Sequence, residues 1–176
     1  MAGYDLPGDK ERIDHRLMRR SPVRLFHDLV ALEDVVSWLA SNGYHVVDVD
    51  ASWTTSRHMF ADLASAFPAC CHDNFQCLHE GLAAGLADAL DRSSGVALVL
   101  RGFDTFATSC WTDAQGLIDL VCEHAWQTAV GGRRFVTLVQ TDTAMDLPAA
   151  RSWAITPWHL DAPAQADPTP PVSGEI

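Results

Sequence analysis

The sequence gathers its metal-binding and nucleophilic residue types in one short stretch. Residues 70–73 read Cys-Cys-His-Asp and are followed by Cys77 and His79. Thiolates and imidazoles are ligands that zinc prefers, but this stretch contains no Cys-x2-Cys pair, and no second Cys/His cluster follows it. Cys77 and His79 also lie about 200° apart around a helix, so they cannot face one ion. We therefore predict no metal and no other cofactor.

The same residues do not make a catalytic arrangement. Cys71 and His72 are neighbours in sequence, whereas a nucleophilic thiol needs an imidazole facing it and a third group that orients the base. The double glycine at 131–132 lacks the Gly-x-x-x-x-Gly-Lys pattern of a phosphate-binding loop. Asp48 and Asp50 at a strand end could serve acid/base chemistry, but solvated acids are far more common at such positions. We expect the protein not to be an enzyme.

The charge of the chain favours a basic partner. The 176 residues carry a formal net charge of −11. Residues 1–27 contain six basic and four acidic side chains, a balance of +2, which leaves −13 for residues 28–176. Such an acidic body attracts basic proteins and repels polyanions, because binding to nucleic acid depends on clustered Lys and Arg. We therefore expect no direct binding of nucleic acid.

Cysteine usage and hydropathy predict a reduced, cytoplasmic protein. Five cysteines are an odd number, and the adjacent Cys70 and Cys71 are a poor framework for disulfides. No charged-then-apolar signal peptide opens the chain, and no apolar run approaches the ~20 residues that span a bilayer. We expect cytoplasmic localisation and no membrane association.

Hydrophobic periodicity predicts an α/β fold. Residues 1–21 are expected to form a flexible arm, and residues 22–43 an extension made of a weak edge strand and a helix. The main domain, residues 44–140, is predicted to contain strands at 44–51, 96–100 and 135–139 and helices at about 59–67, 74–90 and 113–130. Helical crossovers favour parallel pairing of the three strands. The C-terminal extension, 141–176, is expected to be mobile after about residue 160.

A turn joins two of these helices, and the second helix begins with a polar face. Gln76, His79 and Glu80 interrupt an otherwise apolar ladder. Gln76 and Glu80 are spaced i, i+4 and therefore share one face of the helix. These residues alone leave two interpretations open, a solvated face or a surface that binds another molecule.

The turn and helix resemble the segment with which the barstar family, intracellular inhibitors of the ribonuclease barnase, binds its target. Pro68, Asn74, Phe75, Leu78 and Leu82 match the turn and apolar positions of that segment without a gap. Later strands and a later helix are also similar, so that the resemblance covers residues 44–140. Loop insertions are needed after Leu82 and after Val130.

The contact positions of the family are matched less completely than its apolar positions. Glu80 stands where the family has its dominant aspartate, and Glu123 stands at a third acidic contact position. Gln76 occupies the earlier acidic position and is uncharged. His79 replaces a Trp, and Cys70 replaces the Tyr that packs on the target.

The resemblance implies a barstar-like α/β domain, with a small parallel three-stranded sheet packed by helices and with N- and C-terminal extensions. It implies a bacterial immunity protein of the toxin–antitoxin kind, which blocks the cleft of a basic secreted-type ribonuclease with an acidic helix. The residues expected to contact the partner are Cys70, His72, Asp73, Gln76, His79, Glu80 and Glu123. The alternative is a non-inhibitory interaction or regulatory module on the same scaffold, bound to another basic protein.

Overall fold

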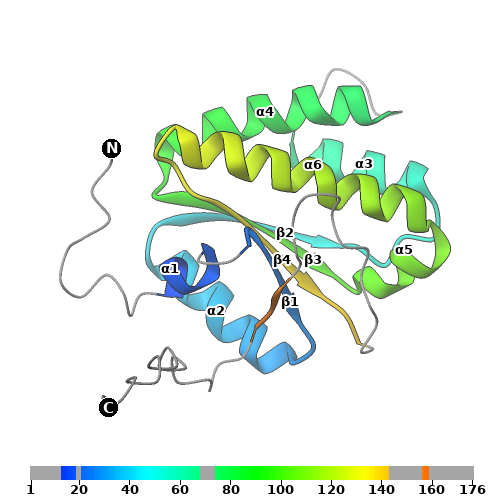
Figure 1. Cartoon of the computed structure of the whole chain (residues 1–176), viewed down its shortest axis with the longest axis horizontal. Helices are drawn as coiled ribbons and strands as arrows, with labels where there is room; N and C mark the ends of the chain where they lie inside the picture. The colour runs from blue at the N-terminus through cyan, green and yellow to red at the C-terminus, as the bar shows by residue number, and fades with distance from the viewer. Residues whose placement is uncertain (1–12, 19–20, 68–73, 143–155, 159–176) are drawn as a thin grey trace, which may run out of the picture.

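A computed structural model describes residues 13–18, 21–67, 74–142 and 156–158 of the chain. In this part, helices and strands alternate along the sequence, and Figure 1 shows their arrangement. The elements in chain order are α1 (Ile13–Met18), β1 (Val23–Phe26), α2 (Leu29–Ser41), β2 (Tyr44–Asp50), α3 (Ser56–Ala66), α4 (Phe75–Arg92), β3 (Gly95–Arg101), α5 (Phe103–Ser109), α6 (Trp111–Val130), β4 (Phe135–Gln140) and β5 (Thr156–Pro157).

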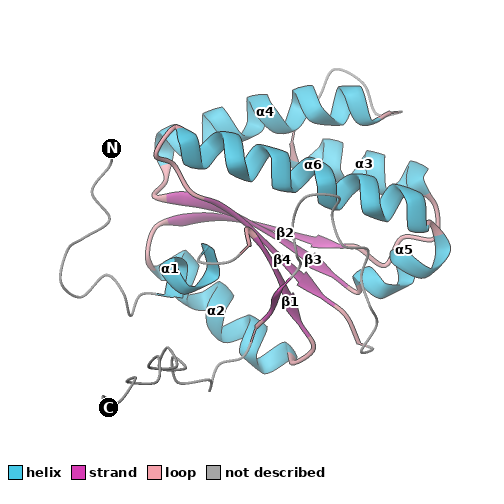
Figure 2. Ribbon diagram, viewed as in Figure 1, coloured by secondary structure: helices cyan, strands magenta, loops and turns pink. Residues whose placement is uncertain are grey.

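The strands form one parallel sheet in the order β2-β3-β4-β1-β5 (Figure 2). The three strands predicted for the main domain are neighbours, with Val47 of β2 opposite Leu98 and Val99 of β3 opposite Leu138. The α/β class and the parallel pairing are confirmed. The prediction of a three-stranded sheet is wrong, because β1 pairs with the other edge of β4 and the two-residue β5 pairs with β1.

Helices cover both faces of this sheet. All of β4 and all but the last residue of β3 are buried, which is typical of strands with a layer of structure on each side. Alternate residues of β3 pack against the helices on opposite faces of the sheet. Val96 and Leu98 pack in a core with α3, α4, α5 and α6, whereas Ala97 and Val99 pack in a second core with α1 and α2. Figure 1 shows these two groups of helices on opposite sides of the sheet.

The N-terminal segment belongs to this architecture. Within the predicted flexible arm, residues 13–18 form α1, and Leu17 is 0% exposed. Arg24 of β1 is only 4% exposed, because its Nε and Nη2 donate to the carbonyl oxygens of Leu17 and Arg16 at 2.5 and 2.7 Å. Because these bonds satisfy the guanidinium of Arg24, the whole of β1 can be buried. It lies inside the sheet and is not the edge strand that the alternation predicted.

The remaining predicted elements of residues 44–140 are present within a few residues of their expected bounds. The short helix α5 was not predicted. Gly102 precedes it with a φ of 64°, a left-handed conformation that favours glycine and turns the chain sharply from β3 into α5. Among the described residues, no helix combines the length and the apolarity that crossing a bilayer requires.

Candidate protein-binding surface

Helix α4 carries three of the seven predicted contact residues, and its first turn is fixed by local contacts. The side chain of Asn74 accepts a hydrogen bond from the backbone N–H of Cys77 at 3.0 Å and so caps the helix. The Phe75 ring packs edge-on against Phe60 of α3, with centroids 5.2 Å apart. On α6, a Cβ at Gly116 would meet Cζ of Phe75 at 2.9 Å. The missing side chain at 116 therefore allows α4 and α6 to approach closely.

Two exposed glutamates lie on these adjoining helices, and a glutamine holds each of them. On α4, Nε2 of Gln76 donates to Oε1 of Glu80 at 2.8 Å. On α6, Nε2 of Gln127 donates to Oε1 of Glu123 at 3.1 Å. Within the described ranges, neither glutamate forms an ion pair. Both carboxylates are thus oriented by an uncharged donor and left facing solvent.

The two helices meet through a pair of histidines beside these glutamates. The ring centroids of His79 and His124 lie 4.5 Å apart, with 37° between the ring planes. His79 directly precedes Glu80, and His124 directly follows Glu123. We call this contact and its two flanking glutamates the α4–α6 seam.

Burial affects one of the two histidines of the α4–α6 seam. His124 is 3% exposed, and its Nε2 has no hydrogen-bond partner among the described residues. Burial, and then the neighbouring His79, lower the pKa of His124 to about 4, against a smaller opposing effect of Glu123. His124 is therefore neutral at pH 7.

Four of the seven predicted contact residues gather at this seam: Gln76, His79, Glu80 and Glu123. The other three lie outside the described residues: Cys70, His72 and Asp73. The structure does not test whether the four bind a partner, so that role stays a prediction.

Sequence reasoning missed three residues that follow Glu123 within one turn: His124, Trp126 and Gln127. A signal existed for Gln127, because it stands i+4 from Glu123 just as Glu80 stands i+4 from Gln76. Trp126 is 58% exposed, and its signal was a large apolar side chain among polar positions of an amphipathic helix. Nothing in the sequence alone pointed to His124, because its role depends on contact with another helix.

The cysteines in the described part of the chain differ in state. Cys77 is disulfide-bonded, so the prediction of reduced thiols throughout is wrong for this residue. An odd number of cysteines does not exclude one bond. Cys110 and Cys122 are free, and burial, with a smaller effect of Asp119, raises the pKa of Cys122 to about 12. Cys122 is thus a protonated, apolar thiol of the core.

Within the described ranges, no group of three or more His, Cys, Asp or Glu side chains is placed to hold a metal ion. The cluster at residues 70–73 lies outside those ranges.

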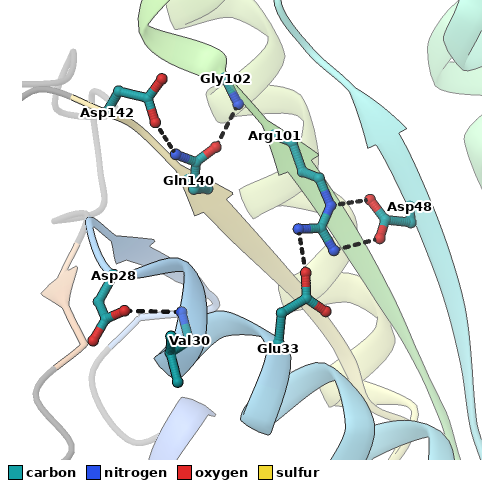
Figure 3. A network of polar contacts seen from close by, with 8 residues as sticks. All are labelled: Asp28, Val30, Glu33, Asp48, Arg101, Gly102, Gln140 and Asp142. Carbon is teal, nitrogen blue, oxygen red and sulfur yellow. Dashed lines mark hydrogen bonds and ion pairs between the residues drawn. The ribbon is translucent and has the colours of Figure 1, made fainter.

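A second polar region lies at the carboxyl edge of the sheet, where open α/β sheets commonly bind ligands. Nε and Nη2 of Arg101 donate to the two carboxylate oxygens of Asp48 at 2.8 and 2.7 Å, and Nη1 donates to Glu33 at 2.7 Å (Figure 3). The bonds to Asp48, and then those to Glu33, raise the pKa of Arg101 further above its ordinary value, against the effect of burial. The guanidinium of Arg101 therefore links β3 to β2 and α2 through these bonds.

Other polar groups at this edge are paired in the same manner. The backbone N–H of Gly102 donates to Oε1 of Gln140 at 2.7 Å, and Nε2 of Gln140 donates to Asp142 at 2.7 Å (Figure 3). Asp50 accepts from the hydroxyl and the backbone N–H of Ser52 at 2.6 and 3.0 Å, and these bonds lower the pKa of Asp50. A carboxyl group held ionised in this way is a poor proton donor.

No protein-family model matches the chain, and no curated protein matches its sequence. The similarity to the barstar family consequently stays a prediction that rests on the matched residues of the turn and of helix α4.

Proposed function

We propose that the chain is a barstar-like inhibitor of a basic ribonuclease and that the α4–α6 seam is its contact surface. The observation that supports this best is the pair Glu80 and Glu123. These are exposed carboxylates on adjoining helices, oriented by glutamines and without an ion-pair partner among the described residues. In this proposal the protein acts in the bacterial cytoplasm and protects the cell from its own toxic ribonuclease.

Two carboxylates on a helical surface suit a cleft that binds phosphates. A ribonuclease holds the RNA backbone with Lys and Arg side chains, and carboxylates satisfy the same donors. The hydrogen bonds from Gln76 and Gln127 restrict the glutamate rotamers, so less conformational entropy is lost on binding. The net charge of −11 would also speed association with a basic protein.

The departures from the family pattern favour a partner other than barnase. Gln76 removes one charge, and His79 and Cys70 each replace an aromatic contact. Loss of a charge pair or an aromatic anchor costs ~2–5 kcal/mol of binding energy when the partner's group is left unpaired. We therefore expect poor inhibition of barnase. We also expect a compensating change in the cognate enzyme at the position that Gln76 contacts. The same departures favour the second candidate, a non-inhibitory module that binds another basic protein.

A ribonuclease assay separates these candidates. The purified chain is titrated into barnase and into a ribonuclease encoded beside its own gene, with a fluorogenic RNA substrate. We expect stoichiometric inhibition of the neighbouring enzyme and weak inhibition of barnase. Tight inhibition of barnase would contradict our interpretation of Gln76, His79 and Cys70. If neither enzyme is inhibited, the proposal fails and the non-inhibitory module is favoured.

A further inference from the structure

A covalent bond lies beside the polar face of α4. Cys77, in the first turn of this helix, is disulfide-bonded. Around the helix axis, at 100° per residue, the exposed pair Gln76 and Glu80 lies next to Cys77 on one side. His79 lies on the other side of this pair and contacts α6 through His124. The polar face is therefore bounded by a disulfide on one side and by the histidine contact on the other.

The partner of Cys77 follows from the other cysteines. The sequence contains five, and Cys110 and Cys122 are free. Cys70 and Cys71 are the two that remain, and a bond from Cys77 to either of them closes a ring of at most eight residues. The bond therefore connects the turn before α4 to the first turn of the helix. Both of these segments contain residues that were predicted to contact a partner.

Helix α4 has other anchors besides this bond. Leu78 and Leu82 pack in the core, and the side chain of Asn74 caps the helix through the backbone N–H of Cys77 at 3.0 Å. Cys77 itself is half-buried, so its sulfur is not enclosed in the core. In the cytoplasm proposed for this protein, thiols are kept reduced, and the disulfides that form there are usually transient or redox-sensing. The bond therefore suits regulation better than support of the fold.

We infer that the Cys77 disulfide is a redox switch of the contact surface, which binds its partner tightly when the bond is closed and more weakly when it is reduced. This inference rests on the proposed function, because the surface concerned is the α4–α6 seam. A short covalent ring restricts the start of α4, so less conformational entropy is lost when Gln76 and Glu80 meet a partner. Reduction removes this restriction and leaves the apolar face of α4 packed in the core.

The chemical step is thiol–disulfide exchange with a cellular monothiol of the glutathione class. The thiolate of one glutathione attacks a sulfur of the bond, so the protein disulfide breaks and a mixed disulfide forms. A second glutathione attacks the glutathione sulfur of this mixed disulfide and leaves as oxidised glutathione. Two electrons and two protons pass to the protein, which gains two thiols. Oxidised glutathione drives the reverse reaction and restores the bond.

Glutathione buffers test the switch apart from any ribonuclease. The full chain is equilibrated with reduced and oxidised glutathione in several ratios, and alkylation with mass spectrometry measures the fraction of Cys77 in the disulfide. We expect this fraction to change reversibly across the ratios while the chain stays folded. A structural disulfide would resist the reduced buffer. A bond that opens only in denaturant, or that never forms, would therefore overturn the inference.

Hydrogen exchange of the same samples shows whether the bond restricts the helix. Reduction should speed exchange of the backbone N–H of Cys77 by about threefold or more, since it lowers the cost of local opening. The N–H of Leu86, which is 3% exposed further along α4, should exchange at the same rate in both forms. Equal exchange of Cys77 in the two forms would contradict control of the first turn by the bond.

Inhibition of the neighbouring ribonuclease tests the effect on binding. Reduction of the wild-type chain should raise the inhibition constant about tenfold. Cys77→Ser cannot form the bond, and it should inhibit equally in both buffers, at the level of the reduced wild type. Cys110→Ser is the matched control, because Cys110 is a free and half-buried thiol. This variant should respond to reduction as the wild type does.

Two further controls complete the assay. Circular dichroism verifies that both serine variants are folded, and the ribonuclease assayed alone in each buffer shows its own response to reduction. A redox response that persists in Cys77→Ser would overturn the inference.

The two sets of measurements separate failure of this inference from failure of the proposed function. If the neighbouring enzyme is inhibited equally by the oxidised and the reduced chain, the inference fails and the function stands. If the bond responds to glutathione and controls exchange in α4 but no ribonuclease is inhibited, redox control of this surface stands and the ribonuclease assignment fails.

Discussion

The molecule has two acidic regions that use their carboxylates in different ways. At the carboxyl edge of the sheet, Asp48 and Glu33 bind Arg101 through bonds of 2.7 and 2.8 Å. At the α4–α6 seam, Glu80 and Glu123 accept hydrogen bonds from glutamines and face solvent. The first region ties a helix to two strands, whereas the second orients charge on a surface.

This difference distinguishes charges that stabilise the fold from charges that are available to a partner. A guanidinium bonded to two carboxylates has few donors left for a ligand. A carboxylate bonded to a neutral amide keeps its attraction for cations. Although ligands commonly bind at the carboxyl edge of such a sheet, the helical surface is therefore the better candidate site in the described part of this chain.

Replacing Glu80 should have the largest effect, and that effect should be confined to binding. Glu80→Ala removes the carboxylate at the position of the family's dominant acid, so the Kd for the cognate ribonuclease should rise about 30-fold, or ~2 kcal/mol. Glu80 is exposed, and its hydrogen bond in the structure is to Gln76, so the melting temperature should stay unchanged. Calorimetric titration and thermal denaturation measure the two quantities.

Asp88→Ala is the control for Glu80→Ala. It removes the same charge from α4, at an exposed residue that is paired with Arg92. Its effect on the Kd should stay within about twofold, since exposed ion pairs and distant charges contribute little. An equal loss of affinity in both variants would mean that net charge, and not the position of Glu80, governs binding.

Removing Arg101 should give the opposite pattern. Arg101→Ala leaves Asp48 and Glu33 close together without their cation. The arginine side chain is 27% exposed, so the loss of unfolding free energy should fall between the values for exposed and buried pairs, at ~1–2 kcal/mol. Urea denaturation measures this loss, and the Kd for the partner should not change.

Arg92→Ala is the control for Arg101→Ala. Its ion pair with Asp88 has side chains 70% and 64% exposed, and its loss should cost at most ~0.5 kcal/mol. If Arg101→Ala weakened binding and left the unfolding free energy intact, the division between the two regions would not hold.

A pH dependence of stability is expected to arise at the seam. The pKa of His124 is about 4 in the folded chain, below its ordinary value, so the unfolded chain binds more protons in acid. Stability should therefore decline as the pH falls from about 6.5 toward 4. His124→Phe keeps an aromatic ring against His79 and should remove this part of the decline.

Urea denaturation between pH 7 and about pH 4.5 tests this expectation, because protonation differs between the folded and unfolded states in that window. His58→Phe, at an exposed histidine of α3, is the control and should follow the wild type. Parallel curves for the wild type and His124→Phe would show that burial at the seam does not affect this titration.

Elements with self-contained patterns could be predicted from the sequence. The apolar stripe of α4 and the continuous apolar runs of β3 and β4 depend only on their own residues. The interior position of β1 could not be predicted in this way. From the sequence alone, an arginine at position 24 indicates a solvent-facing residue. In the structure it is buried because carbonyl oxygens of α1 accept hydrogen bonds from its guanidinium. That contact joins two segments that were interpreted as an arm and an edge strand.

The candidate site was predictable to a similar extent. The spacing of Gln76 and Glu80 predicted a shared face, and the structure adds the hydrogen bond between them. The α4–α6 seam was not predictable, because the contact between the rings of His79 and His124 depends on how two helices pack. Trp126 stands out only once the buried face of α6 is known.

The close approach of Phe75 to Gly116 affects how such a surface could diverge among relatives. Any side chain at 116 would collide with the ring, so either the ring or the first turn of α4 would have to move. Where the helix moves, the distance between Glu80 and Glu123 changes although both residues stay the same. The volume at one small residue outside the proposed contacts would therefore adjust the charge spacing that a partner must match, and specificity could shift with no change in charge.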